Sequence, residues 1–281
     1  MSTALLITKG HPFDKAAFFA VFDALIADPD CELTDYTHVE QPAARVFFDP
    51  ARAEPWDVFV MYDMPGLVFG PDYQGLEFEE QSEELMTGTN ALLEAGKGMV
   101  FLHHALAGWP SWEDWARIMG GRFHYRPAVL DGVEYPDSGY HHDVTHTVEV
   151  LDASHPIVAG VPDRFEITDE VYLAAVLEGA VEPLLRSTHE FTAANFWSAD
   201  AAIRGKLYNN EGWSHPEGSS LVGWTKHAGN SPVAYLQFGD TAQTYADANY
   251  RLLVGNAINW ATSNGAYEWA RARREARGTF A

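Results

Sequence analysis

The sequence contains a single cysteine, Cys31, among its 281 residues. One cysteine excludes an internal disulfide and any metal site built from several thiolates, and it is typical of a reducing cytoplasm. Cys31 also lies at the start of an early expected strand, far from any strand-to-helix corner that would expose a nucleophile. We therefore predict a cytoplasmic protein that does not use cysteine-based catalysis.

Positive charge is also scarce, because 18 lysines and arginines face 40 aspartates and glutamates and give a net charge of -22. This acidic excess argues against nucleic acid and anionic membranes as partners. No apolar run approaches the ~18 residues of a membrane-spanning helix, and the apolar start of the chain predicts a strand rather than a signal peptide. We expect a small-molecule sugar as the ligand. An acidic chain with an arginine-bearing terminal helix could also form a homodimer.

Three catalytic signatures are missing from the chain. It has no G-x-S-x-G nucleophile elbow, no phosphate-binding P-loop and no H-E-x-x-H metal motif. The run Gly96-Lys97-Gly98 precedes an expected strand instead of following one, so it is not a dinucleotide fingerprint. The chemistry must therefore come from some other arrangement of residues.

Apolar periodicity predicts a β-α-β order and a parallel sheet. Strands are expected at residues 4–8, 32–38, 56–63, 99–102 and 233–238. Helices are expected at residues 14–27, 77–94, 245–261 and about 265–278. Residues 64–73 are interpreted as a loop, and residues about 120–230 as short antiparallel strands and long loops that decorate one end of the sheet. We predict one domain over residues 1–281.

Two adjacent histidines, His103 and His104, end the buried strand that is expected at residues 99–102. In open parallel sheets, ligands bind at the carboxyl ends of the strands, and histidine titrates near neutral pH. Adjacent side chains at such a corner diverge, so we expect one of the two to face the cleft. The alternative is a hydrogen-bonded pair with a structural role.

Other polar residues follow expected strands in the same way. His11, Asp63 and Asp240 each come just after a strand, which would bring them to one edge of a parallel sheet. Taken singly, each is as compatible with a turn or a helix cap. Their shared position favours a common site.

Two acidic residues, Asp169 and Glu170, follow a short expected strand and precede Tyr172. Adjacent carboxylates can supply a general base or a metal ligand, and the alternative is a helix cap. A histidine-rich tract at residues 139–143, with His146, is not favoured as a metal site, because side chains of an antiparallel strand alternate between faces.

Six motifs in order resemble the trehalose-utilisation (ThuA-like) family over about residues 4–262. They are Lys9-Gly-His11-Pro, Asp57-Val-Phe-Val-Met-Tyr-Asp63, Gly96-x-Gly-Met-Val-Phe-Leu-His103-His104-Ala, His155-Pro-Ile-x-x-Gly160, Phe165-x-x-x-Asp169-Glu170-x-Tyr172 and Asn256-Ala-Ile-x-Trp260-Ala. The resemblance implies a flavodoxin-like, three-layer parallel sheet flanked by helices and related to class I glutamine amidotransferases.

The resemblance also bears on chemistry. In those amidotransferases a cysteine occupies the corner that His103 takes here, so glutaminase activity is not expected. The family is linked to sugar catabolism, beside oxidoreductases that make 3-keto sugars. Many members have Leu-Gly-His after the last sheet strand, whereas this chain has Phe238-Gly239-Asp240. Asp240 therefore need not inherit the role of that histidine.

The leading hypothesis is an enzyme of carbohydrate catabolism that acts on a glycoside or keto-sugar by elimination, isomerisation or hydrolysis. The expected catalytic residues are His103 or His104 as acid or base and Asp169 or Glu170 as the partner. The expected substrate-binding residues are His11, Asp63, Trp109, Trp112, Tyr172 and Asp240. A divalent metal that polarises the ketone is an open variant. The alternatives are a non-catalytic sugar-binding or regulatory protein and a non-glycosidic metallohydrolase.

Overall fold

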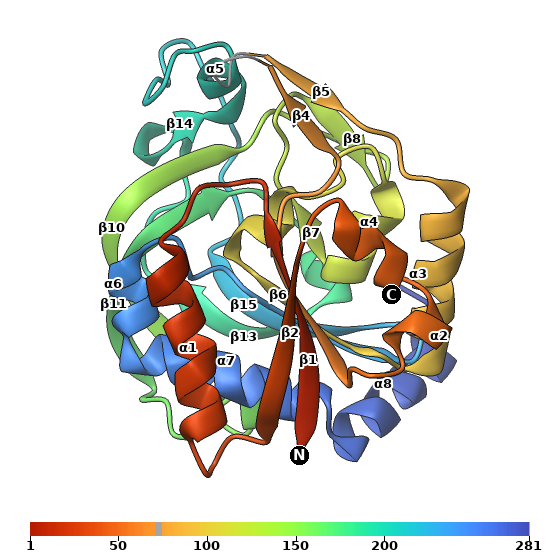
Figure 1. The fold of residues 1–281 in the computed structure, drawn as a ribbon. Helices are drawn as coiled ribbons and strands as arrows, with labels where there is room; N and C mark the ends of the chain where they lie inside the picture. The colour runs from red at the N-terminus through yellow and green to blue at the C-terminus, as the bar shows by residue number, and fades with distance from the viewer. Residues whose placement is uncertain (71–74, 281) are drawn as a thin grey trace.

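The computed structural model describes residues 1–70 and 75–280, and its centre is a 10-stranded sheet (Figure 1). The parallel half comprises β1 (Ser2–Lys9), β2 (Leu33–Glu40), β3 (Val58–Asp63), β6 (Gly98–Leu102) and β16 (Ser231–Leu236). The antiparallel half comprises β10 (Gly139–Val150), β11 (Arg164–Leu173), β13 (Glu182–Ser187), β14 (Trp197–Ser198) and β15 (Leu221–Ala228). The order is β11-β10-β13-β15-β16-β6-β3-β1-β2, and β14 pairs with β10.

The central parallel strands form where the sequence places uninterrupted apolar runs. All residues of β3, β6 and β16 are buried, as is typical of strands that are covered on both faces. Val60 of β3 pairs with Leu6 of β1 and with Val100 of β6, and Val100 pairs with Ala234 of β16. The carboxyl ends of these strands therefore meet along one edge of the sheet.

Helices cover both faces of this sheet and make three layers (Figure 1). The principal helices are α1 (Lys15–Ala27), α3 (Glu83–Ala95), α4 (Glu113–Met119), α7 (Ala248–Ala261) and α8 (Asn264–Arg277). Successive residues of β1 point to opposite faces of the sheet and therefore belong to different apolar cores. Leu6 is in the core that contains residues of α1 and α7, whereas Ile7 is in the core that contains residues of α3 and α4. The expected parallel sheet with flanking helices is confirmed.

Three local predictions need correction. The expected loop at 64–73 contains β4 (Leu67–Phe69), which pairs with β5 (Leu76–Phe78); residues 71–73 lie outside the described part. That pairing uses the start of the helix expected at 77–94, so α3 begins only after Ser82, whose hydroxyl caps it. The helix expected at 245–261 is two helices, α6 (Ala242–Ala246) and α7, because Asp247 caps the second one.

The region of residues 120–230 also differs from the expectation. Its strands are antiparallel, as predicted, but β10 and β11 span 12 and 10 residues and extend the central sheet itself. They do not merely decorate one end. Figure 1 shows β10 as a long curved strand that bends around one side of the molecule. This curvature lets the far edge of the sheet approach the carboxyl ends of the parallel strands.

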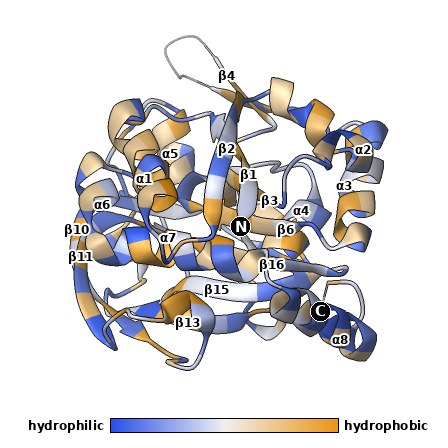
Figure 2. Ribbon diagram, turned by 60° about the horizontal axis from the view of Figure 1, so that its bottom comes forward, coloured by the Kyte–Doolittle hydropathy of each residue, from blue (hydrophilic) through white to orange (hydrophobic). Residues whose placement is uncertain are grey.

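The terminal helix α8 is mostly hydrophilic along its length (Figure 2). Three of its arginines pair with acidic residues of the same chain: Arg274 with Glu94 at 2.6 Å, and Arg273 and Arg277 with Glu182 at 2.9 and 3.4 Å. These arginines thus have intramolecular partners, and the homodimer stays a prediction. None of the helices in residues 1–70 and 75–280 is long and apolar enough to cross a membrane.

The start of β6 tests how tightly this sheet packs. A Cβ atom at Gly98 would lie 2.3 Å from the carbonyl oxygen of Ala261, whereas one at Gly179 would meet nothing within 4 Å. We expect Gly98→Ala to destabilise the protein by about 2 kcal/mol, because backbone atoms on both sides must move. Gly179→Ala is the matched control and should change the free energy of unfolding by less than about 0.5 kcal/mol. Urea denaturation measures both, and equal midpoints would contradict the close approach.

Candidate active site

The centre of the site is the corner that follows β6. The chain turns there into a short 3-10 helix, His103–Ala107, and His103 has a positive φ of 39°. Such a conformation is unusual for a residue other than glycine and is often found at functional sites. The hydroxyl of Tyr235 donates to the carbonyl oxygen of His103 at 3.1 Å. Both His103 and His104 are buried, and their ring centroids lie 4.3 Å apart.

The ring of His103 is fixed from two sides. Its Nδ1–H donates to the carbonyl oxygen of Gln237, which can only accept. Its Nε2 lies 3.2 Å from Oε2 of Glu170 and 3.0 Å from the hydroxyl of Tyr172. Burial lowers the pKa of His103, but the Glu170 hydrogen bond and nearby carboxylate charge outweigh it and raise the pKa to about 9. The contact between Nε2 and the carboxylate therefore requires a proton or another cation.

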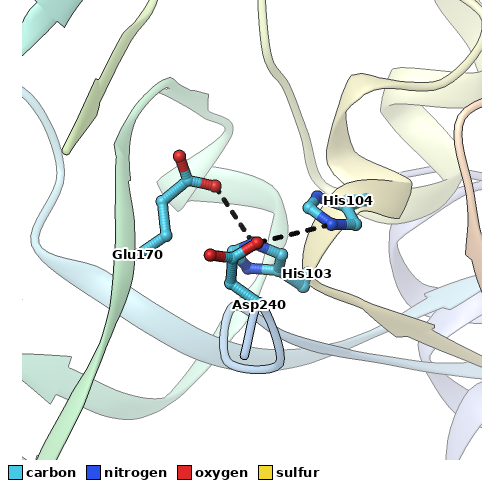
Figure 3. Close-up of side chains that lie close together, drawn as sticks. All are labelled: His103, His104, Glu170 and Asp240. Atoms are coloured by element: carbon cyan, nitrogen blue, oxygen red, sulfur yellow. Dashed lines mark hydrogen bonds and ion pairs between the residues drawn. The ribbon is translucent and has the colours of Figure 1, made fainter. Parts of the chain in front are cut away.

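The carboxylates of Glu170 and Asp240 both face histidines (Figure 3). Asp240 Oδ1 lies 3.7 Å from His104 Nε2 and 3.8 Å from His103 Nε2, while Glu170 Oε1 lies 3.0 Å from His142 Nδ1. In the described part of the chain, every ion pair of these two carboxylates is with a histidine. Burial raises the pKa of Asp240, whereas the bond from His103 outweighs burial at Glu170 and lowers its pKa.

Asp169 has a different role from its neighbour Glu170. Successive residues of β11 face opposite sides of the sheet, and the Asp169 carboxylate accepts from the backbone N–H groups of Gly239 at 2.6 Å and Asp240 at 3.1 Å. Burial is the main cause that raises the pKa of Asp169 to about 6. Asp169 thus holds the turn that carries Asp240, in which Gly239 has a φ of 124°.

A cavity of about 530 Å³ opens above this cluster. Its polar lining consists of His11, His104, His142, Glu170 and Tyr172. Its apolar lining includes Phe69, Phe123, Tyr125, Tyr140, Ile203 and Leu207. Phe69 ends β4, Phe123 and Tyr125 follow the short strand β7 (Gly121–Arg122), Tyr140 is in β10, and the last two residues come from α5 (Ala199–Ile203) and the chain that follows it. The cavity therefore has a polar floor and largely apolar walls.

Six of the ten predicted site residues meet at this floor: His11, His103, His104, Glu170, Tyr172 and Asp240. Asp169 lies directly behind them, as described above. His104 lines the cavity itself, whereas His103 is beneath the lining and touches Glu170. The catalytic and binding roles of these residues stay predictions.

Four predicted substrate-binding residues are not part of the described cavity lining: Asp240, which belongs to the histidine–carboxylate cluster beneath it, and three others. Trp109 is buried against Gly66, and the Arg45 guanidinium lies 4.8 Å from its ring centroid. Trp112 packs beside it in the core next to α4. The interpretation of the two tryptophans as a cavity wall is therefore wrong, because the 3-10 turn directs this segment into the core. The third, Asp63, is buried and accepts from Gln41 Nε2 at 2.7 Å.

One residue that the sequence reading did not favour, His142, lies in the cavity lining. The pairing of β10 with β11 shifts register between His141 and Val144, and Asp143 has a φ of 54°. Because of this bulge, His142 is outside the regular pairing of β10 with β11, and its side chain lies beside Glu170. A sequence signal was present, because Tyr140 and His142 are two residues apart and so share one face of the strand.

Four residues could hold a metal ion: His103, His104, Glu170 and Asp240. Each offers one ligand atom, and these atoms all lie within 4.8 Å of one another. Mixed imidazole and carboxylate ligands suit divalent transition metals.

Comparison with known proteins agrees with this arrangement. The model of the family described as trehalose utilisation, ThuA, matches residues 57–261. The chain belongs to the ThuA family. No curated protein matches its sequence.

Solved structures show the same fold as this ThuA-family chain. A ThuA-like protein from Parabacteroides merdae has a TM-score of 0.61 at 16% identity, over 93% of this chain and 90% of that one. One from Bacteroides uniformis has a TM-score of 0.59 at 16% identity, over 94% and 92%. A cytoplasmic protein from Salmonella typhimurium has a TM-score of 0.55 at 12% identity, over 93% and 99%. At these identities the likeness concerns the fold alone.

Asp63 gives a pH-dependent prediction. Burial raises its pKa from 3.8 to about 7. Between these values the folded state keeps a proton that the unfolded state has lost, so its contribution to stability declines as the pH rises from about 4 through 7. Asp63→Asn should therefore increase the free energy of unfolding at pH 9, by on the order of 1–3 kcal/mol, and change it little at pH 4.

The control for this prediction is Asp163→Asn, because Asp163 is exposed. Denaturant titrations at pH 4 and pH 9 compare the two variants with the parent protein. An equal effect of Asp63→Asn at both pH values would show that Asp63 does not titrate in this way.

Proposed function

We propose that this ThuA-family protein is a cytoplasmic enzyme of carbohydrate catabolism that acts on a glycoside or a keto-sugar derivative. The reaction is acid-base chemistry at a carbon–oxygen bond. The family description supports a carbohydrate substrate. A cavity of about 530 Å³ is within the usual range for small-molecule sites, and its aromatic side chains offer flat apolar faces to a sugar ring.

The observation that carries the proposal is the pair formed by His142 and Glu170 in the cavity lining. His142 Nδ1 lies 3.0 Å from Glu170 Oε1, so the carboxylate is directly beside the imidazole ring. A carboxylate in this position stabilises the positive charge that an imidazole acquires when it acts as a general base. His142 is only partly buried, at 32% side-chain exposure, and can therefore touch a substrate.

The steps follow from the chemistry of a ketone. A carbonyl group acidifies the neighbouring C–H bond, and Nε2 of His142 takes that proton. The carbon–oxygen bond to the leaving group then breaks, and protonated His11, which lines the same cavity, gives a proton to the leaving oxygen. The products are an unsaturated ketone and an alcohol. Addition of water to the double bond completes a net hydrolysis. If the enolate formed by the first proton transfer is instead reprotonated at another atom before the carbon–oxygen bond breaks, the result is isomerisation.

Other residues of the floor bind and position the substrate. His104 and Tyr172 line the cavity and are hydrogen-bonded to each other at 3.1 Å, so they can bind sugar hydroxyl groups. His103 lies behind Glu170 and fixes its orientation. Asp169 acts through the turn that holds Asp240. Of the predicted catalytic residues, Glu170 and His104 line the cavity, His103 positions Glu170, and Asp169 positions Asp240.

The test compares His142→Gln with His141→Gln. Glutamine at residue 142 keeps a polar side chain beside Glu170 but cannot act as a base, so turnover should fall by about 10²–10⁴-fold. His141 is the matched control, because its Nδ1 binds the carbonyl oxygen of Asn195 and its ring packs against Trp197. Its replacement should preserve most of the activity.

The measurement is product formation from a panel of glycosides and their keto derivatives, by mass spectrometry, with sugar binding followed by calorimetry. Binding should change little in His142→Gln. Equal turnover in both variants would remove His142 from the mechanism. Sugar binding by the parent protein without any product would favour the non-catalytic sugar-binding alternative.

A further inference from the structure

We propose that His103, His104, Glu170 and Asp240 bind one divalent transition-metal ion, with zinc the best match, directly beneath the cavity floor. The inference deepens the proposed function and rests on it for the role of the ion in turnover. Metal binding itself is independent of any substrate and can be measured alone.

The spacing of the ligand atoms fits such an ion. Zinc bonds to nitrogen and oxygen are ~2.1 Å long, which places the ligand atoms of a tetrahedral site ~3.4 Å apart. Nε2 of His103 lies 3.2 Å from Glu170 Oε2 and 3.8 Å from Asp240 Oδ1, and Nε2 of His104 lies 3.7 Å from Asp240 Oδ1. Figure 3 shows Glu170 and Asp240 approaching, from two other segments, the segment that carries His103 and His104.

Both imidazoles present the correct nitrogen. The Gln237 carbonyl oxygen accepts from Nδ1–H of His103 and so leaves the lone pair on Nε2. Tyr172 is bonded to Nδ1 of His104 at 3.1 Å, which leaves Nε2 of His104 for the cluster. Metal-bound histidines commonly hold their second nitrogen by such contacts, which set the tautomer and the ring orientation.

A proton alone does not satisfy this cluster. A proton on His103 Nε2 would serve the contact with Glu170, but Nε2 of His104 is buried and has no hydrogen-bond partner among the described residues. A buried, unpaired nitrogen is costly in free energy. A metal ion between the four groups would satisfy both Nε2 atoms and both carboxylates at once.

The ligand set also selects among metals. Mg²⁺ and Ca²⁺ prefer oxygen ligands, whereas two imidazoles favour zinc and its first-row neighbours. His104 and Glu170 line the cavity, so the ion would be close enough to polarise a carbonyl or hydroxyl oxygen of the substrate. His142 and His11 are outside the ligand set and stay available for proton transfer.

The experiment begins with protein that has been dialysed against a chelator. Calorimetric titration with Zn²⁺ should give about one ion per chain, and Mg²⁺ under the same conditions should give no measurable binding. Titration with Co²⁺ should produce the visible absorption bands of a four-coordinate nitrogen and oxygen site. Absence of both the Zn²⁺ isotherm and the Co²⁺ bands would overturn the proposal.

Variants locate the ion. Asp240→Asn and His104→Gln should each weaken Zn²⁺ binding by about 100-fold or more, because each removes one ligand. His146→Gln is the control, since His146 is also a buried histidine but bonds Ser187 and is not one of the four proposed ligands. It should bind Zn²⁺ as the parent protein does. Unchanged Zn²⁺ affinity in Asp240→Asn and His104→Gln would place the ion elsewhere and overturn the assignment.

The outcomes separate metal binding from function. If a variant does not fold by circular dichroism, the Co²⁺ spectrum of the parent protein still decides whether the site exists. Zn²⁺ binding without turnover of any sugar substrate supports the metal site and contradicts the proposed function. Full turnover by metal-free protein supports the proposed function and removes the ion from it.

Discussion

The site depends on one buried imidazole. His103 connects the end of β6, the segment after β16 and the strand β11, through its contacts with Gln237 and Glu170. Nδ1–H of His103 donates to a carbonyl oxygen, and Nε2 faces a carboxylate. The contact between Nε2 and the carboxylate therefore needs a positive charge, either a proton or another cation. Among the described residues, no lysine or arginine forms an ion pair with these carboxylates, so the cation must be a proton or a bound ion. The packing of the three chain segments around His103 thus sets the chemistry of the cavity.

The two halves of the sheet contribute different parts of the site. The parallel half supplies His11, His103, His104 and Asp240 at the carboxyl ends of its strands, as open α/β sheets commonly do. The antiparallel half supplies His142, Glu170 and Tyr172 from β10 and β11, which curve toward that edge (Figure 1). Neither half forms the cavity alone, so the extension of the sheet by residues 139–228 creates the site rather than decorating it.

Much of the fold and part of the site could be predicted from the sequence. Strand ends are visible as apolar runs that stop at polar residues, and a parallel order alone brings His11, His103 and Asp240 to one edge. The orientation of Trp109 and Trp112 could not be predicted, because it depends on the 3-10 turn after His103. The tract that contains His142 was not favoured because side chains of a regular antiparallel strand alternate between faces, and the sequence does not predict the bulge between His141 and Val144.

The departure at Asp240 from the Leu-Gly-His pattern that the family resemblance implies has an electrostatic consequence. With Asp240 and Glu170 ionised, the two carboxylates would balance the charge of the proposed divalent ion, and the two imidazoles would bind it as neutral ligands. A buried cluster with no net charge costs much less free energy than one with an unpaired charge. Asp169 does not upset this balance, because two backbone N–H groups bind its carboxylate. A histidine in place of Asp240 would leave the bound ion with one uncompensated positive charge, so the aspartate favours a tightly held dication here.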